Sequence, residues 1–225
     1  MLSLLPLLIV LQAADARPVG VGPAPSPVPI AWEFELRFLD PQRIEVQIAG
    51  QREEYWYVVY TVENRSGTTQ RFYPTFQIVT EDLNVIDTDL GVSPLVFEAI
   101  RERHRITHKY LVHPTEGIGD LRTGDDHALE SVAIWRTSDL AANNFTMYVA
   151  GLSGETRLVR NPVYDPDSPE TIVLDTPRGG PRDVSVNPKT FTLRKTLEVT
   201  YRLPGSPAGR AAARPERSLV RWIMR

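Results

Sequence analysis

The chain has 225 residues, of which 42% are hydrophobic and 24% are charged, proportions that allow a buried core and exclude disorder of the whole chain. Its net charge of −3 is too small to indicate binding to nucleic acid or to an anionic membrane surface. Cysteine is absent, which excludes disulfides, thiolate metal sites and cysteine nucleophiles.

Residues 1–16, MLSLLPLLIVLQAADA, have the pattern of a secretory signal peptide. Their apolar run is far shorter than the roughly 20 residues that a membrane-spanning helix needs. Small residues at Ala14 and Ala16 favour cleavage after Ala16, with no membrane span afterwards. We therefore expect an extracytoplasmic protein (periplasmic, in the cell envelope or secreted), and the lack of cysteine is more typical of bacteria. No basic residue precedes the apolar run, so a cytoplasmic protein with a Leu-rich start is the alternative.

The rest of the chain is predicted to be a linker followed by one domain. Residues 17–30 contain five prolines, which favour an extended, semi-rigid Pro-rich linker. The domain is expected to span residues 31–225, with a flexible segment at 204–216 that is rich in small residues, proline and arginine. Two smaller sandwiches divided near Pro114 are the alternative. We expect the apolar residues 218–225 to pack on the domain's own core.

The domain opens with alternating apolar and polar residues from Trp32 to Phe38, the period of a half-buried strand. Asp40-Pro41-Gln42 predicts a turn, and the alternation resumes over residues 44–48, so we expect a β-hairpin. Residues 49–54 are polar and are predicted to form a loop.

The most β-prone stretch is Tyr55–Val62, in which every residue is aromatic or β-branched. Both of its faces are largely apolar, which predicts a central strand that is covered on both sides. A turn follows at residues 64–67. In the next strand Pro74 donates no hydrogen bond, so that strand is expected to lie at an edge or to bulge.

A helix is predicted over about residues 94–104. Ser93 can cap its N-terminus, and Pro94 suits the first helical position. Its apolar side, with Phe97 and Ile100, is expected to cover the second face of the central strand.

Beyond the helix the pattern predicts short strands separated by loops. The expected strands span residues 106–112, 129–135, 145–149, 156–160, 171–174 and 190–201, the last with a bulge at Arg194-Lys195. The expected loops span residues 115–126, where a short hairpin is the alternative, 161–169 and 177–188, the last with its tip at residues 178–180.

Four short motifs carry a resemblance to known proteins: VENRSG at 62–67, GDL at 119–121, VAIW at 132–135 and VAGLS at 149–153. They resemble an uncharacterised family of exported proteins from planctomycete-type bacteria, from about Tyr55 to the C-terminus. The resemblance implies an immunoglobulin-like β-sandwich and brings no catalytic residues. The expected fold is therefore all-β: an immunoglobulin-like antiparallel β-sandwich with one short packed helix.

The histidines are candidate metal ligands, since His104 and His108 have the spacing of a helical metal pair. However, Ile106 and Thr107 are β-branched, so we expect the helix to end before His108. On a strand the two histidines would lie about 13 Å apart. We therefore expect a solvated basic surface, with Arg101, Arg103, Arg105 and Lys109, and no metal site. The acidic turns do not match the EF-hand spacing for calcium.

No enzyme signature is present. Gly151-Leu152-Ser153-Gly154-Glu155 departs from G-x-S-x-G at its last position, and no phosphate-binding glycine motif occurs. A carboxylate pair for glycoside hydrolysis leaves no spacing signal, so a hydrolase is a third hypothesis.

The function expected first is a non-enzymatic, exported structural or protein-binding module without cofactor or catalytic residues. Its partner would be an unknown envelope protein or glycan. The alternative is a carbohydrate-binding module of the cell envelope, with Tyr55, Tyr57 and Trp135 as the ligand platform. That alternative requires the three rings to share an exposed face.

Overall fold

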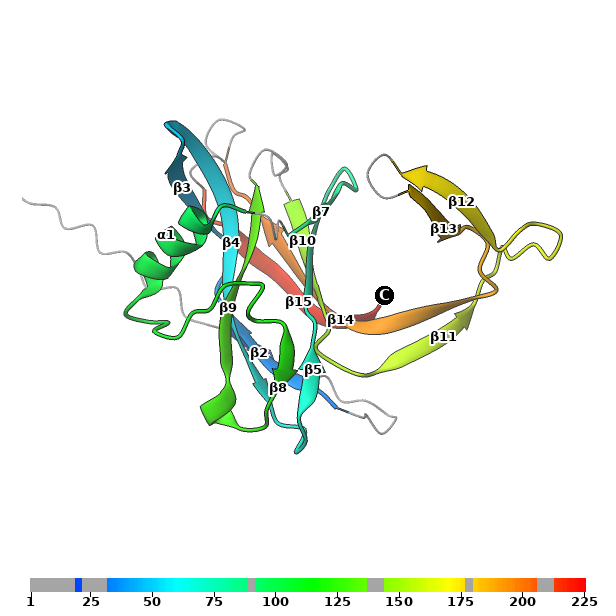
Figure 1. Cartoon of the computed structure of the whole chain (residues 1–225), viewed down its shortest axis with the longest axis horizontal. Coiled ribbons are helices and arrows are strands. Elements are labelled where there is room, and N and C mark those ends of the chain that lie inside the picture. Colours follow the sequence, from blue (N-terminus) through cyan, green and yellow to red (C-terminus); the bar gives the residue numbers. More distant parts are fainter. Residues whose placement is uncertain (1–18, 22–31, 89–91, 137–143, 177–179, 206–212) are drawn as a thin grey trace, which may run out of the picture.

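The computed structural model describes residues 19–21, 32–88, 92–136, 144–176, 180–205 and 213–225 (Figure 1). Two antiparallel sheets pack face to face, and one short helix covers the outer face of the first sheet. The predicted all-β sandwich with a short helix is confirmed, while its immunoglobulin-like character stays a prediction. None of the described helices is long and apolar enough to cross a membrane.

The first sheet is organised around β4, a strand of 14 residues. One edge of β4 pairs with both β2 and β3, the other edge pairs with β9, and β1 pairs with β2. The strands are β1 (Val19–Val21), β2 (Phe34–Phe38), β3 (Gln42–Ile48), β4 (Gln51–Asn64) and β9 (Leu129–Arg136).

The predicted hairpin between the first two strands of the domain is wrong. β2 and β3 do not pair with each other but follow one another along the same edge of β4. Phe38 lies opposite Tyr60 and Gln42 lies opposite Tyr57. The four residue steps from Phe38 to Gln42 therefore match only three steps along β4. Pro41 therefore lies in a bulge, where the absence of a donor is tolerated.

The observed hairpin joins β3 to β4 through Ala49 and Gly50 alone. Both residues have positive φ, 50° and 83°, as a tight two-residue hairpin turn requires. The loop predicted at residues 49–54 is therefore reduced to these two residues, and β4 begins at Gln51.

The second sheet has the order β7, β6, β10, β14, with β15 on the far edge of β14. Its strands are β6 (Thr75–Thr80), β7 (Val85–Asp87), β10 (Asn144–Ala150), β14 (Thr190–Arg202) and β15 (Glu216–Met224). Because β15 pairs with β14, the C-terminal segment lies on the domain itself, as predicted. Strands that precede Pro114 in the chain and strands that follow it contribute to one core, which favours one domain over two smaller sandwiches.

Apart from β11, which pairs with the first part of β14 and extends the second sheet, the remaining elements lie outside the two main sheets. Pro74 separates β5 from β6, and β5 pairs with β8 as a small two-stranded sheet. The elements are β5 (Gln70–Phe72), α1 (Pro94–His104), β8 (Gly119–Leu121), the short 3-10 helix η1 (Asp125–His127), β11 (Thr156–Arg160), β12 (Thr171–Thr176) and β13 (Gly180–Ser185).

Two cores lie on opposite faces of β4. Trp56, Val58 and Tyr60 pack between the sheets, against buried residues of β6, β10 and β14. Tyr57 and Val59, on the opposite face, pack under α1. The central position of β4 and the helix that covers it were both predicted, and both are confirmed.

Several predictions concern residues that the structure does not describe. The predicted signal peptide at 1–16 lies outside the described residues, as does most of the linker at 17–30 and part of the segment at 204–216. Within that linker, residues 19–21 form β1, because the open edge of β2 offers its backbone groups as hydrogen-bonding partners.

Candidate binding surfaces

The predicted aromatic platform is absent. Tyr55, Tyr57 and Trp135 are 1%, 0% and 0% exposed. The two tyrosines lie under α1, whereas Trp135 lies opposite Trp56 in the core between the sheets. The prediction of an exposed platform at these residues is wrong, because the aromatic composition of a strand is the same whether a second layer covers it or not.

Tyr57 instead lies at the centre of a polar network under α1. Its hydroxyl donates to Gln42 Oε1 (3.0 Å), lies 3.0 Å from His104 Nε2, and accepts from Arg103 Nη1 (3.2 Å). Burial, with the nearby charges of His108 and Arg103, lowers the pKa of His104 to about 4. His104 is therefore neutral at pH 7, and the network fixes the end of α1 on the sheet.

The histidines do not form a metal site in the described part of the chain, where no group of three or more potential ligands occurs. The helix ends at His104, as expected, and the rings of His104 and His108 lie 5.6 Å apart. The strand predicted over residues 106–112 is wrong: Thr107 and His108 donate to the His104 carbonyl and continue the chain as turns.

A shallow hollow beside α1 contains three of the four cations of the predicted basic surface, whereas Arg103 donates to the Tyr57 hydroxyl and to the Arg43 carbonyl. The hollow has a volume of about 470 Å³, and Arg101, Arg105 and Lys109 contribute to its lining. Arg101 pairs with Glu98 (2.5 Å) and Arg105 with Glu102 (3.1 Å), so much of the positive charge is neutralised. Such exposed pairs are ordinary solvated surface.

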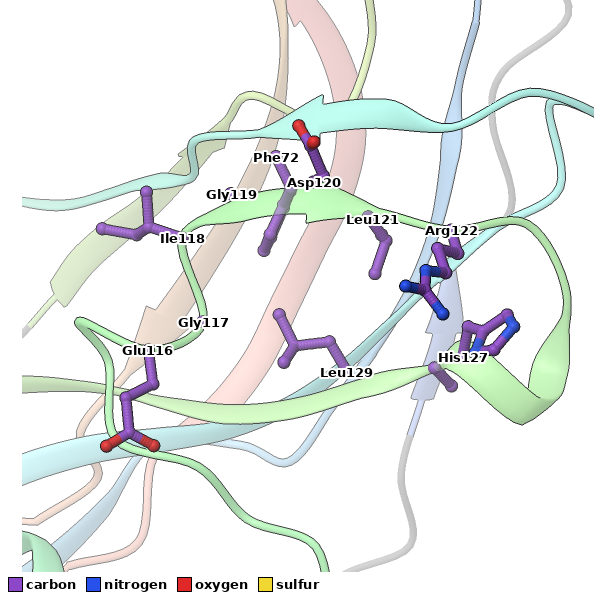
Figure 2. A pocket seen from close by; sticks show the side chains of 11 residues that line it. Phe72, Glu116, Gly117, Ile118, Gly119, Asp120, Leu121, Arg122, His127 and Leu129 are labelled. Atoms are coloured by element: carbon purple, nitrogen blue, oxygen red, sulfur yellow. The ribbon is translucent and has the colours of Figure 1, made fainter.

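A second hollow, of about 310 Å³, lies beside β8 (Figure 2). Leu121 and Leu129 point toward one another across it, and Arg122 and His127 lie at one end. Glu116 and Asp120 point away from the hollow, so its lining side chains do not bring together the two carboxylates that glycoside hydrolysis uses.

A buried charged cluster, which the sequence pattern does not reveal, lies where β14 enters the sandwich. Lys195 is 5% exposed, and its Nζ lies 2.5 Å from Glu33 Oε1 and 3.2 Å from Glu155 Oε2. Burial alone would lower the pKa of Lys195, but hydrogen bonds to the two carboxylates raise it. Lys195 therefore stays charged, and its three-residue cluster holds strands from distant parts of the chain together.

Residues 156–194, which we call the arm, project from the sandwich beyond this cluster (Figure 1). The arm consists of β11, β12, β13 and the first part of β14. The bulge predicted at Arg194-Lys195 is wrong, because the register shift of β14 lies between Thr200 and Tyr201. At Arg194-Lys195 the strand instead leaves the arm: β11 pairs with it up to Arg194, and β10 pairs with it from Leu197 onward. Residues 190–194 are exposed or half-buried, whereas residues 195–199 are buried.

Apolar side chains of the arm are exposed to solvent. Val163 is 81% exposed, Leu158 72% and Val173 65%. The exposed apolar side chains of the arm are those of Leu158, Val163, Ile172, Val173, Leu174, Val186 and Phe191. The predicted loop at 177–188 contains β13, which pairs with β12 and begins at Gly180. The other two residues of its expected tip, 178 and 179, lie outside the described residues.

The shape of the arm is held by polar contacts. The Asn161 amide donates to the Pro188 carbonyl (2.8 Å). The Asn187 amide donates to the carbonyls of Asp165 (2.6 Å) and Ser168 (3.2 Å). These bonds order the loop between β11 and β12 without burying the apolar side chains of the strands.

Comparison of the chain with models of protein families, with curated proteins and with solved structures found no match.

Proposed function

We propose that the protein is a non-enzymatic, exported module that binds a protein partner through the arm. The observation that carries this proposal is the set of apolar side chains exposed on an element that packs on neither core of the domain. Soluble proteins rarely expose contiguous apolar surface unless that surface meets a partner. The exported location rests on the signal-peptide pattern of residues 1–16.

The energetics support this assignment of the arm. Full burial of an aliphatic side chain contributes about 1.5–3 kcal/mol, so covering Leu158, Val163 and Val173 is a substantial driving force for association. An isolated two-stranded hairpin is also only marginally stable in water, so β12 and β13 gain stability from a partner.

The test is affinity capture from an envelope extract with three forms of the purified protein. The arm variant carries Leu158→Ser, Val163→Ser and Val173→Ser. The control variant carries Leu83→Ser, Ile106→Ser and Tyr110→Ser, which are 80%, 82% and 76% exposed but lie outside the arm. Circular dichroism confirms that all three forms are folded.

The proposal predicts that the control variant and the unmodified protein capture the same protein, and that the arm variant loses it. Capture that is equal for all three forms would overturn the proposal. Enrichment of a polysaccharide in place of a protein would also overturn it.

A further inference from the structure

Along the outer edge of β12, every second residue presents backbone N–H and C=O groups that pair with no described strand. The Val186 amide donates to the Glu170 carbonyl (3.0 Å), so residues 170 and 186 form a hydrogen-bonded pair just beyond the ladder of β12 and β13. Bonded and non-bonded pairs alternate in an antiparallel ladder. The N–H and C=O groups of Thr171, Val173 and Asp175 therefore point away from β13.

The position of Pro181 agrees with this phase. Pro181 lies opposite Asp175, in a pair that makes no hydrogen bond, and it has no N–H to donate. Among the described residues β12 pairs only with β13, so the three outward-facing residues of β12 have no strand partner.

β12 has few of the features that usually protect an edge strand, which are Pro, charged side chains, a bulge or a covering segment. Its one charged residue is Asp175, near its end. Ile172, Val173 and Leu174 are instead consecutive apolar residues, 37%, 65% and 46% exposed. The outward phase of β13 contains Pro181, and β11 contains Arg157 and Arg160, so those edges are protected.

We propose that β12 pairs antiparallel with β12 of a second copy of this chain, about a two-fold axis through Val173. The proposal deepens the proposed function, on which it rests, by naming the partner of the arm. Val173 then lies opposite its own copy, and Ile172 lies opposite Leu174. Residues 171, 173 and 175 form three bonded pairs, with about six backbone hydrogen bonds between the copies.

The strand ends select this axis over the others that the phase allows. Within β12 the axis through Val173 gives three bonded pairs, axes through residues 172 and 174 give two each, and axes through Thr171 and Asp175 give one each. A second copy is assigned because the edge complements itself about this axis: apolar Val173 meets its own copy, and apolar Ile172 meets Leu174.

One face of the new four-stranded sheet has an apolar patch across the two-fold axis, bordered by Arg182, which lies opposite Leu174. Ile172 and Val184 are directly paired, and Leu174 lies two residues along β12, so these side chains share one face of the hairpin. The two-fold axis brings the same three side chains of the second copy alongside. The strand pair is smaller than a standard interface of roughly 1,600 Å², so the dimer is expected to be reversible and to depend on concentration.

Cysteine cross-linking of the full protein tests both the edge and the register, because the chain contains no other cysteine. With Val173→Cys, the two new residues lie opposite each other, about 5.5 Å apart between Cα atoms, within the range of a disulfide. With Ile172→Cys, the two copies lie about 8 Å apart, too far for a disulfide without backbone movement. Val163→Cys is a control on the same arm, outside β12.

The expected result is a disulfide-linked dimer that forms at least ten times faster with Val173→Cys than with Ile172→Cys or Val163→Cys. Sedimentation velocity should show a concentration-dependent dimer for the unmodified protein and for Val163→Lys. Val173→Lys, which places two charges at the axis, should weaken the dimer at least tenfold. Val173 is 65% exposed, so neither substitution disturbs a core.

The inference is overturned if the unmodified protein stays monomeric at all concentrations and the three cysteine variants cross-link equally slowly. It is also overturned if an extended segment of a different protein occupies β12. In either case loss of envelope capture by the arm variant would still support the proposed function. Conversely, a dimer with the predicted register would stand even if envelope capture did not depend on the arm.

Discussion

Replacement of Lys195 by methionine should destabilise the protein strongly. The substitution keeps the length and the apolar stem of the side chain but removes the ammonium group from between Glu33 and Glu155. The side chains of Lys195, Glu33 and Glu155 are 6%, 14% and 19% exposed, so two largely buried carboxylates would lose their counter-charge. Breaking a buried pair in this way costs about 3–5 kcal/mol. Because both carboxylates keep some exposure, we expect the low end, about 3 kcal/mol.

Urea unfolding followed by tryptophan fluorescence measures this effect. With a slope of about 2–3 kcal/mol per molar urea, the midpoint should fall by about 1 M while the slope stays unchanged. The matched control is Lys195→Met combined with Glu33→Gln and Glu155→Gln, which removes the unpaired charges. This triple variant should recover more than half of the lost stability.

The pH dependence provides a second check. The folded pKa of Lys195 is raised above its ordinary value of 10.5, so its contribution is fully present below pH 10.5 and is lost as the pH rises through the folded pKa. The difference between the unmodified protein and Lys195→Met should therefore shrink at high pH. A loss below about 1 kcal/mol at pH 7, or no recovery in the triple variant, would refute the assignment of a buried charged cluster.

Three further predictions concern stability and are measured by urea unfolding. The pKa of His104 is lowered to about 4 by burial, so the free energy of unfolding should be highest above about pH 6.5 and fall by about 2–3 kcal/mol toward pH 4. His104→Gln should flatten this dependence on pH. Parallel pH profiles of the variant and the unmodified protein would contradict the prediction. Gly151→Ala should cost about 3 kcal/mol, because φ is +85° there and a Cβ would collide with the Tyr73 carbonyl; a neutral variant would contradict this geometry. Asn64→Ala should also cost about 3 kcal/mol, since its fully buried amide makes four hydrogen bonds; a cost below 1 kcal/mol would show that water replaces them.

The wrong prediction at residues 40–42 shows where a sequence pattern does not decide the path of the chain. Asp40-Pro41-Gln42 has the composition of a turn, yet the chain continues along the same edge of β4. Turn residues favour a change of direction, but a bulge accommodates them equally well when a long neighbouring strand offers backbone partners on both sides of the interruption. The length of β4 decided between these outcomes, and that length depends on pairing.

The sequence pattern did not predict which apolar strands are exposed, for a related reason. Ile172, Val173 and Leu174 have the same strand-like composition as Val58 and Val59, which are buried. Composition reports that a side chain gains from burial, and it does not report whether a second layer is present to bury it.

The sequence by itself determined the local features whose physical causes lie within a few residues. Ser93 and Pro94 start α1, and the continuous β-prone run at 55–62 makes β4 central. These follow from propensity, capping and the period of apolar residues.

Only the tertiary structure decided which surfaces are free and which charges meet. Glu33 and Lys195 lie 162 residues apart in the chain, so no local pattern links them. The burial of Tyr57 and Trp135 and the exposure of the arm likewise depend on which layer each strand faces. Layer packing is set by contacts between distant segments, and for this protein those contacts separate the buried aromatic strands from the apolar arm that extends into solvent.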